Sequence, residues 1–284
     1  MEKLKALVKS STVTPDKLHQ WLDKGLPAGQ VFKNMKLDQP NVFSLFYNPS
    51  FVKWVQYADD LSAKSPSKAS SVISTLTSLY GDKVVYEVIY AAKKYPNLRE
   101  LASRLQEDQL RYWIAIRKDS SVFFDLLNLN LRWTGTTTLT KQEFAVWLKY
   151  VDDVNARHPE AAPLSIIPTL AQSLGRTGRD GNVELVKIID AGKDNFKSEA
   201  VAKRMESELF DFWLRRQETP DKIMNMLKHD TPTSAFLGSP RWKEWEKYLN
   251  VYNARFPEKK TTAIETYVGK HGGVNLVAQL AKAM

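Results

Sequence analysis

The hydrophobic residues of this chain follow a pattern that occurs three times. In each copy a tryptophan is followed by a tyrosine three residues later and by a proline twelve residues later, and apolar residues also lie three residues before the tryptophan and four and seven residues after it. This spacing forms an apolar stripe along one face of a helix. The pattern therefore predicts three amphipathic helices with their aromatic rings in a core. The aromatic pairs are Trp54 and Tyr57, Trp147 and Tyr150, and Trp245 and Tyr248.

Local signals predict where these helices begin and end. Asn48 and Ser239 are good N-cap residues and each precedes a proline, while the run from Thr140 to Glu143 matches a capping box. The proline twelve residues after each tryptophan should end the helix, because proline cannot continue the hydrogen-bond ladder. We therefore expect three helices of similar length.

Other landmarks keep the same register. Trp21, Trp113 and Trp213 precede the first set of tryptophans by 33, 34 and 32 residues. Downstream, each copy has a helix that ends at Tyr80, Leu174 or Tyr267, then a glycine-containing turn and a last helix. No alternating strand pattern of useful length occurs, and we interpret the threonine-rich segment 135–139 as a loop. Internal repeats of this kind indicate an array of similar units.

The sequence therefore predicts an all-α fold, arranged as a tandem array of three five-helix modules. The predicted modules span residues 1–96, 97–197 and 198–284. Predicted helices that begin near Asn97 and Ser198 lead directly from one module into the next. Because the units of such an array contact only their neighbours, we expect an elongated rod.

Composition narrows the possible functions. The chain has 284 residues, of which 43% are hydrophobic, and it contains no run of eighteen apolar residues, so we expect no membrane insertion. The absence of cysteine excludes disulfides and thiol catalysis and suits a reducing compartment. The four histidines occupy four different repeat positions, so we expect no metal site.

No catalytic apparatus is visible in the sequence. There is no nucleophile elbow, and no pair of carboxylates stands out from the solvated charged faces. The glycine-rich segment 175–181 lacks the Gly-Lys-Ser/Thr of a phosphate-binding loop, so we interpret it as a flexible loop. We predict that the protein is not an enzyme and uses no cofactor.

The net charge of +9 leaves an alternative open, namely a helical nucleic-acid-binding protein that uses a basic face. Lysine and arginine are scattered along the chain with acidic residues between them, so a basic patch would have to be assembled by folding. We therefore rank nucleic-acid binding second.

The aromatic residues that keep register are assigned to the structural core, because large rings stabilise small helical units. This core set is Trp21, Trp54, Tyr57, Tyr80, Trp113, Trp147, Tyr150, Trp213, Trp245, Tyr248 and Tyr267. Trp133 lies off the register in a predicted loop, and Arg176 and Arg179 lie in the glycine-rich segment. These three residues are our candidates for contacting a partner.

Taken together, these landmarks resemble the LWY tandem repeat of RXLR-type effectors from oomycete plant pathogens. The resemblance rests on the upstream tryptophan segment, the Trp-x-x-Tyr helix, the sequence Tyr80-Gly81-Asp82 and the closing Ala-Lys helix, and it covers essentially the whole chain. It implies core pairs of Trp54 with Tyr80 and of Trp245 with Tyr267, whereas the middle module has Leu174 at the tyrosine position. The family's Arg-x-Leu-Arg leader has no match here. We expect that the sequence begins at the effector domain, with Met1 as an added start.

The resemblance also implies a function. A protein of this family would be secreted by the pathogen, enter the cytoplasm or nucleus of the host cell, and bind a host plant protein without catalysis, which suppresses or redirects immunity. The candidate partners are the scaffold subunit of the type 2A protein phosphatase (protein phosphatase 2A), on which the effector would replace a regulatory subunit, and components of trafficking or autophagy.

Overall fold

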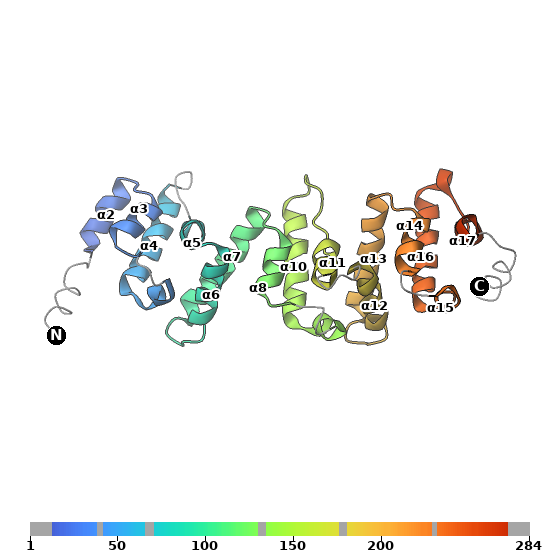
Figure 1. Cartoon of the computed structure of the whole chain (residues 1–284). Helices are drawn as coiled ribbons and strands as arrows, with labels where there is room; N and C mark the ends of the chain where they lie inside the picture. The colour runs from blue at the N-terminus through green and yellow to red at the C-terminus, as the bar shows by residue number, and fades with distance from the viewer. Residues whose placement is uncertain are drawn as a thin grey trace. The chain divides into compact units, whose positions relative to one another are not determined.

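The computed structural model describes residues 13–38, 42–65, 71–129, 135–175, 181–228 and 232–271. These ranges contain helices and no strand, which confirms the all-α class (Figure 1). The chain divides between Lys118 and Asp119 into two compact units. The division into three modules and their rod-like arrangement remain predictions.

The helices of the two units follow in order along the chain. The first unit contains α2 (Pro15–Asp23), α3 (Ala28–Asn34), the 3-10 helix η1 (Val42–Tyr47), α4 (Pro49–Lys64), α5 (Val72–Tyr80), α6 (Asp82–Ala92) and α7 (Arg99–Ala115). The second contains α8 (Ser120–Leu126), η2 (Gly135–Thr140), α10 (Gln142–Arg157), α11 (Ile167–Gly175), α12 (Gly181–Lys193), α13 (Glu199–Arg215), α14 (Pro220–Lys228), α15 (Thr233–Phe236), α16 (Pro240–Arg255), η3 (Pro257–Lys259) and α17 (Ala263–His271).

The three Trp-x-x-Tyr segments form α4, α10 and α16, which we call the anchor helices. Each has 16 residues and ends ten residues after its tryptophan, as the spacing of the prolines predicts. Two of the predicted N-caps are confirmed. The side-chain oxygen of Asn48 accepts a hydrogen bond from the backbone N–H of Ser50 at 2.9 Å, and that of Ser239 accepts one from Trp242 at 3.2 Å. These bonds satisfy amide groups that the first helical turn leaves unpaired.

The start of α10 differs from the prediction. The predicted capping box at Thr140 is wrong, because Thr140 is the last residue of η2 and its hydroxyl donates to the carbonyl of Thr137 at 3.0 Å. The N-cap is Lys141, whose side chain makes no capping bond. Segment 135–139 is likewise not an irregular loop. It forms most of η2, which packs on α10 and α12 and buries Thr138 and Leu139.

Each anchor helix is tied to a preceding short helix by its buried tryptophan. The indole N–H groups of Trp54, Trp147 and Trp245 donate to the carbonyls of Ala28, Ser120 and Pro220 at 2.8, 2.9 and 2.7 Å. Each acceptor is the first residue of its short helix, α3, α8 or α14. All three tryptophans are fully buried. One ring therefore contributes both apolar burial and a directional bond.

The tyrosines of the first and third anchor helices fix the turn that precedes the short helix. The hydroxyl of Tyr57 donates to the carbonyl of Leu26 at 2.7 Å, and that of Tyr248 donates to the carbonyl of Glu218 at 2.6 Å. Burial raises the pKa of both hydroxyls, so they remain protonated donors at neutral pH. In the second anchor helix, the ring of Tyr150 packs edge-on against Phe123 with the centroids 5.0 Å apart.

Truncating an anchor tryptophan should be much more costly than removing a tyrosine hydroxyl. We expect Trp54→Ala to lower the free energy of unfolding by about 3 to 5 kcal/mol, because it removes a large buried ring and leaves the Ala28 carbonyl without its indole donor. Tyr57→Phe on the same helix, which loses only one hydrogen bond, should cost about 0.5 to 1.5 kcal/mol. Urea unfolding followed by circular dichroism measures both. Equal losses in the two variants would refute the role given to the ring.

Candidate functional site

Most residues of the predicted core set are buried in the structure. The buried members are Trp54, Tyr57, Trp113, Trp147, Tyr150, Trp213, Trp245, Tyr248 and Tyr267. Trp21 and Tyr80 are only partly buried and pack against the edge of the first unit's core. The three residues proposed as partner contacts, Trp133, Arg176 and Arg179, lie outside the described residues.

The pairs implied by the LWY resemblance are connected through a third ring. Phe32 lies between Trp54 and Tyr80, with its ring centroid 4.7 Å from the first and 6.4 Å from the second. In the third copy Trp242 takes this place, with centroid distances of 4.8 Å to Trp245 and 6.1 Å to Tyr267. These rings are therefore part of the scaffold and are not open to a ligand.

A repeated asparagine, which the sequence analysis missed, holds the loop after two of the anchor helices. The amide of Asn155 donates to the carbonyl of Leu164 at 3.0 Å and accepts from its N–H at 2.7 Å. Asn253 makes the same two bonds with Thr261, at 2.7 and 3.0 Å. Both asparagines lie eight residues after their tryptophan, which is the sequence signal that identifies them.

Four charged residues form a partly buried group at the meeting point of α12, α13 and α16, which we call the ionic cluster. Lys193 donates to Glu206 at 2.7 Å and to Glu244 at 3.1 Å, and Lys247 contacts the same two carboxylates at 2.8 and 3.3 Å. The Glu244 side chain is only 2% exposed. One of its oxygens has no hydrogen-bond partner among the described residues.

The two carboxyl groups of the ionic cluster have pKa values that move in opposite directions. Burial raises the pKa of Glu244, and the neighbouring Glu206 carboxyl group adds to the effect. Burial also opposes ionisation of Glu206, but its hydrogen bonds to the other members of the cluster lower its pKa to about 2. The burial of Lys193 opposes its charge too, yet its bonds to the two carboxylates raise its pKa. Glu206 therefore carries a stable negative charge between two ammonium groups.

The ionic cluster suits a structural role better than a catalytic one. Its carboxylates are occupied by lysines, and other residues line the hollows that open at the surface of the described chain. Among the described residues, no group of three or more acidic, histidine or cysteine side chains is placed to hold a metal ion. The cluster joins three helices of the second unit.

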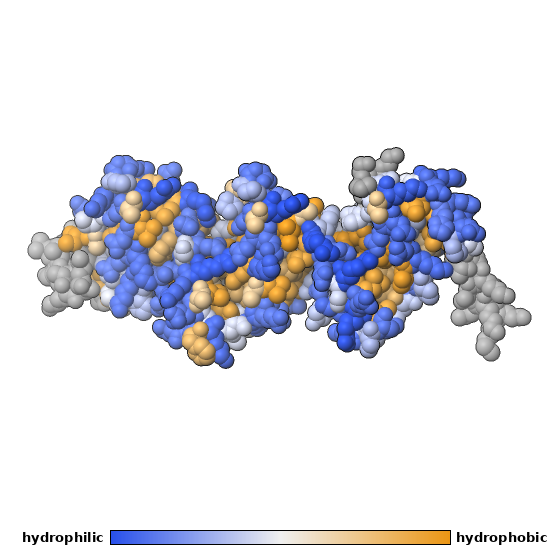
Figure 2. Space-filling view, turned by 180° about the vertical axis from the view of Figure 1, so that it is seen from behind, coloured by the Kyte–Doolittle hydropathy of each residue, from blue (hydrophilic) through white to orange (hydrophobic). Residues whose placement is uncertain are grey.

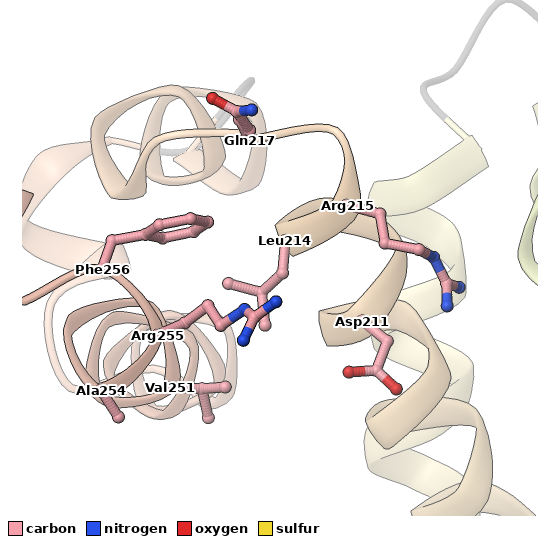
Figure 3. A pocket seen from close by; sticks show the side chains of 8 residues that line it. All are labelled: Asp211, Leu214, Arg215, Gln217, Val251, Ala254, Arg255 and Phe256. Atoms are coloured by element: carbon pink, nitrogen blue, oxygen red, sulfur yellow. The ribbon is translucent and has the colours of Figure 1, made fainter.

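The largest of these hollows lies between the C-terminal ends of α13 and α16, and we call it the α13/α16 groove (Figure 3). Its volume is about 710 Å³, within the range of known binding sites. Apolar side chains contribute much of the lining, and the charged side chains extend from both helices (Figure 3). The lining residues are Asp211, Leu214, Arg215, Gln217, Val251, Ala254, Arg255 and Phe256.

The arginines of the α13/α16 groove differ from others in their unit. Arg215 and Arg255 make no ion pair or hydrogen bond with any described residue, whereas Arg204 of α13 donates to both carboxylate oxygens of Asp152 at 2.6 and 2.9 Å. Arg216 pairs with Glu218 at 3.2 Å. Because guanidinium groups bind carboxylates in a bidentate manner, the two unpaired arginines are the groove's most available polar groups.

Two other hollows open at the surface of the described residues. A hollow of about 420 Å³ lies on the opposite side of the α13 end and also includes Arg215. A third, of about 500 Å³, lies between α3 and α5 and has Lys33 as its one charged lining residue. Elsewhere on the face shown in Figure 2, hydrophobic residues are visible between larger hydrophilic areas. None of the helices in the described ranges has the length and apolar content needed to cross a membrane.

Three tryptophan-anchored copies of one helical pattern define the chain as an all-α tandem-repeat protein. No family model matches the sequence. An RxLR effector protein of Phytophthora infestans (strain T30-4) is 63% identical over 283 residues, which make up 100% of this chain and 41% of that protein. The RxLR effector protein PSR2 of Phytophthora sojae is 32% identical over 249 residues, or 87% of this chain and 36% of that protein. The chain belongs to the RxLR effector family, as the resemblance noted from the sequence implies.

The chain spans about two fifths of the length of the first of these relatives. Among solved structures, the crystal structure of PcRxLR12 aligns with 94% of this chain and 65% of its own, at 27% identity and a TM-score of 0.47. The family assignment therefore rests on the sequence matches.

The ionic cluster should make stability depend on pH in acid. The folded-state pKa of Glu206, about 2, lies below its ordinary value of 4.5, so its contribution to the free energy of unfolding is present above pH 4.5 and is lost as the pH falls toward 2. We expect Glu206→Gln to cost about 1.5 to 3 kcal/mol at pH 7 and progressively less below pH 4.5. Urea unfolding at several pH values measures this difference.

Glu199→Gln is the matched control, because Glu199 pairs with Lys203 on the exposed face of the same helix. It should change stability little at any pH. A Glu206→Gln loss that stays constant from pH 7 to pH 2 would show that the charge of Glu206 does not stabilise the cluster.

Proposed function

We propose that this chain is the host-protein-binding part of a secreted RxLR effector and that it acts by occupying a partner without catalysis. The observation that carries the proposal is a division of roles among the repeat positions. The anchor tryptophan and tyrosine are present in every copy, whereas several positions that line the α13/α16 groove, among them those of Arg215, Val251 and Phe256, change from copy to copy. A surface that varies on a constant scaffold suits recognition of a specific protein.

The substitutions at the groove positions change the charge and the apolar character of the side chains. Six residues after the anchor tryptophan, the first two copies have an aspartate and the third has an apolar residue. One residue after the end of the anchor helix, the third copy alone has a large apolar side chain. The residues are Asp60, Asp153 and Val251 at the first position, and Ser65, His158 and Phe256 at the second.

We further propose that the partner is a host plant protein met in the cytoplasm or nucleus, with the scaffold subunit of protein phosphatase 2A as the first candidate. On this proposal the effector takes the place of a regulatory subunit and thereby redirects the phosphatase and suppresses immunity. A trafficking or autophagy component is the second candidate. Membership of the RxLR family and the LWY repeat pattern support both.

Binding to a purified partner tests this function. We expect the chain, mixed with the purified plant scaffold subunit, to elute from a sizing column as a one-to-one complex. A purified regulatory subunit should displace it. The chain has no catalytic role in this proposal, because it only occupies a site. A rate of dephosphorylation should therefore change only when the phosphatase core is present.

A matched experiment with generic RNA and DNA separates the alternative function. A nucleic-acid-binding protein would bind both, with an affinity that falls steeply as salt rises. Such binding, together with no complex on either the scaffold subunit or purified trafficking and autophagy components, would contradict the proposed function.

A further inference from the structure

The first copy of the repeat contains an ion pair that joins two helix ends. Asp23, the last residue of α2, lies two residues after Trp21, and Lys64, the last residue of α4, lies ten residues after Trp54. The ammonium group of Lys64 donates to the Asp23 carboxylate at 2.8 Å. In this copy the two helix ends thus neutralise each other.

The third copy has two positive charges at these same repeat positions. Arg215, the last residue of α13, lies two residues after Trp213, and Arg255, the last residue of α16, lies ten residues after Trp245. The carboxylate of the first copy is thereby replaced by a guanidinium. These are the two arginines of the α13/α16 groove that make no ion pair or hydrogen bond with the described residues.

Two guanidinium groups cannot form the ion pair that joins the helix ends of the first copy. In Figure 3 Arg255 extends toward Leu214, whereas the side chain of Arg215 extends away from Arg255. Asp211 lies one turn before Arg215 on α13, but it forms no ion pair with either arginine. The groove therefore has two cations and one carboxylate, and the counter-charge found between the helix ends of the first copy is missing.

The surface between the two arginines is apolar. Leu214 and Phe256 point into the groove in Figure 3, and Val251 is 39% exposed. The ammonium group of Lys259 lies 5.5 Å from the centre of the Phe256 ring and adds a further positive charge at this side. An apolar floor with cations at its sides complements a ligand that has both an apolar side chain and a negative charge.

We propose that the α13/α16 groove binds a segment of the host partner that combines an aspartate or glutamate with a neighbouring large apolar residue. The partner's carboxylate supplies the charge that Asp23 supplies in the first copy, and it pairs with Arg215 and Arg255. The apolar side chain packs on Leu214, Val251 and Phe256. This inference rests on the proposed function, since it names the chemistry of the surface that the host protein presents.

A protein segment fits the groove better than a polyanion such as a nucleic acid. A nucleic acid presents closely spaced phosphates, and the Asp211 carboxylate at the side of the groove repels a second phosphate beside the first. An acidic and apolar peptide offers a carboxylate for the two arginines and an apolar side chain for the floor.

The test uses the complete chain and a fluorescein-labelled, capped peptide of alternating leucine and aspartate. Two analogues replace either every aspartate by asparagine or every leucine by serine. We expect the parent peptide to bind about tenfold more tightly than either analogue, because each analogue loses one of the two kinds of contact. Fluorescence anisotropy measures the three affinities.

Variants of the chain show whether the groove is the site. Arg215→Asp recreates the pairing of the first copy, so it should close the groove with an intact fold and weaken parent-peptide binding about tenfold or more. Arg215→Ala should weaken binding less, because it removes one cation without closing the groove. Arg157→Asp is the matched control. It makes the same charge change at the last residue of α10, the repeat position that Arg255 occupies in the third copy, and it should leave binding unchanged.

Three results would overturn the inference: no binding of the parent peptide, equal binding of the asparagine analogue, or full binding by Arg215→Asp with the circular dichroism and melting temperature of the parent chain. Binding of single-stranded DNA that Arg215→Asp abolishes, with no peptide binding, would assign the groove to a polyanion instead. The proposed function is tested separately. If Arg215→Asp still forms the complex with the purified host partner, the partner uses another surface and only the inference about the groove is wrong.

Discussion

The structure depends on one contact that is made three times: a buried indole N–H donates to the first carbonyl of the preceding short helix. Because a buried polar group must find a partner, this bond fixes how the ring is oriented as well as where it lies. Other contacts in each copy are built around this tryptophan. The tyrosine one turn later reaches the turn before the short helix in two of the copies, and a third aromatic ring, Phe32 or Trp242, fills the space toward the next helix.

A scaffold held from within leaves its outer positions free to change. Two sites show such changes between copies. The ionic cluster lies where α12, α13 and α16 meet, and the α13/α16 groove lies at the surface. In the cluster, Glu244 is buried at a repeat position whose equivalent in the second copy, Val146, is exposed. Such networks specify one arrangement of helices more than they add stability. At the groove, an ion pair between helix ends has become a pair of like charges.

The sequence predicted the repeated parts well because their physical causes are local. The spacing of Trp54 and Tyr57 and the N-caps Asn48 and Ser239 identify helices whose ends the structure confirms. The capping box at Thr140 failed because η2 occupies its residues, which only the packing on α10 and α12 reveals. Arg215 and Arg255 were not predicted as candidate site residues. In the sequence each is an ordinary arginine in the last turn of a helix. Only the structure shows that the equivalent residues Asp23 and Lys64 form an ion pair, which Arg215 and Arg255 cannot form.

Hydrogen exchange of the indole N–H protons, followed by NMR on the uniformly ¹⁵N-labelled chain, tests the role of the anchor tryptophans most directly. Trp54, Trp147 and Trp245 should exchange only through large unfolding events, because their N–H groups are buried and bonded, whereas the partly buried Trp21, which has no such bond among the described residues, should exchange much faster. Exchange of the three anchor indoles as fast as that of Trp21 would contradict the claim that these rings hold the repeats together.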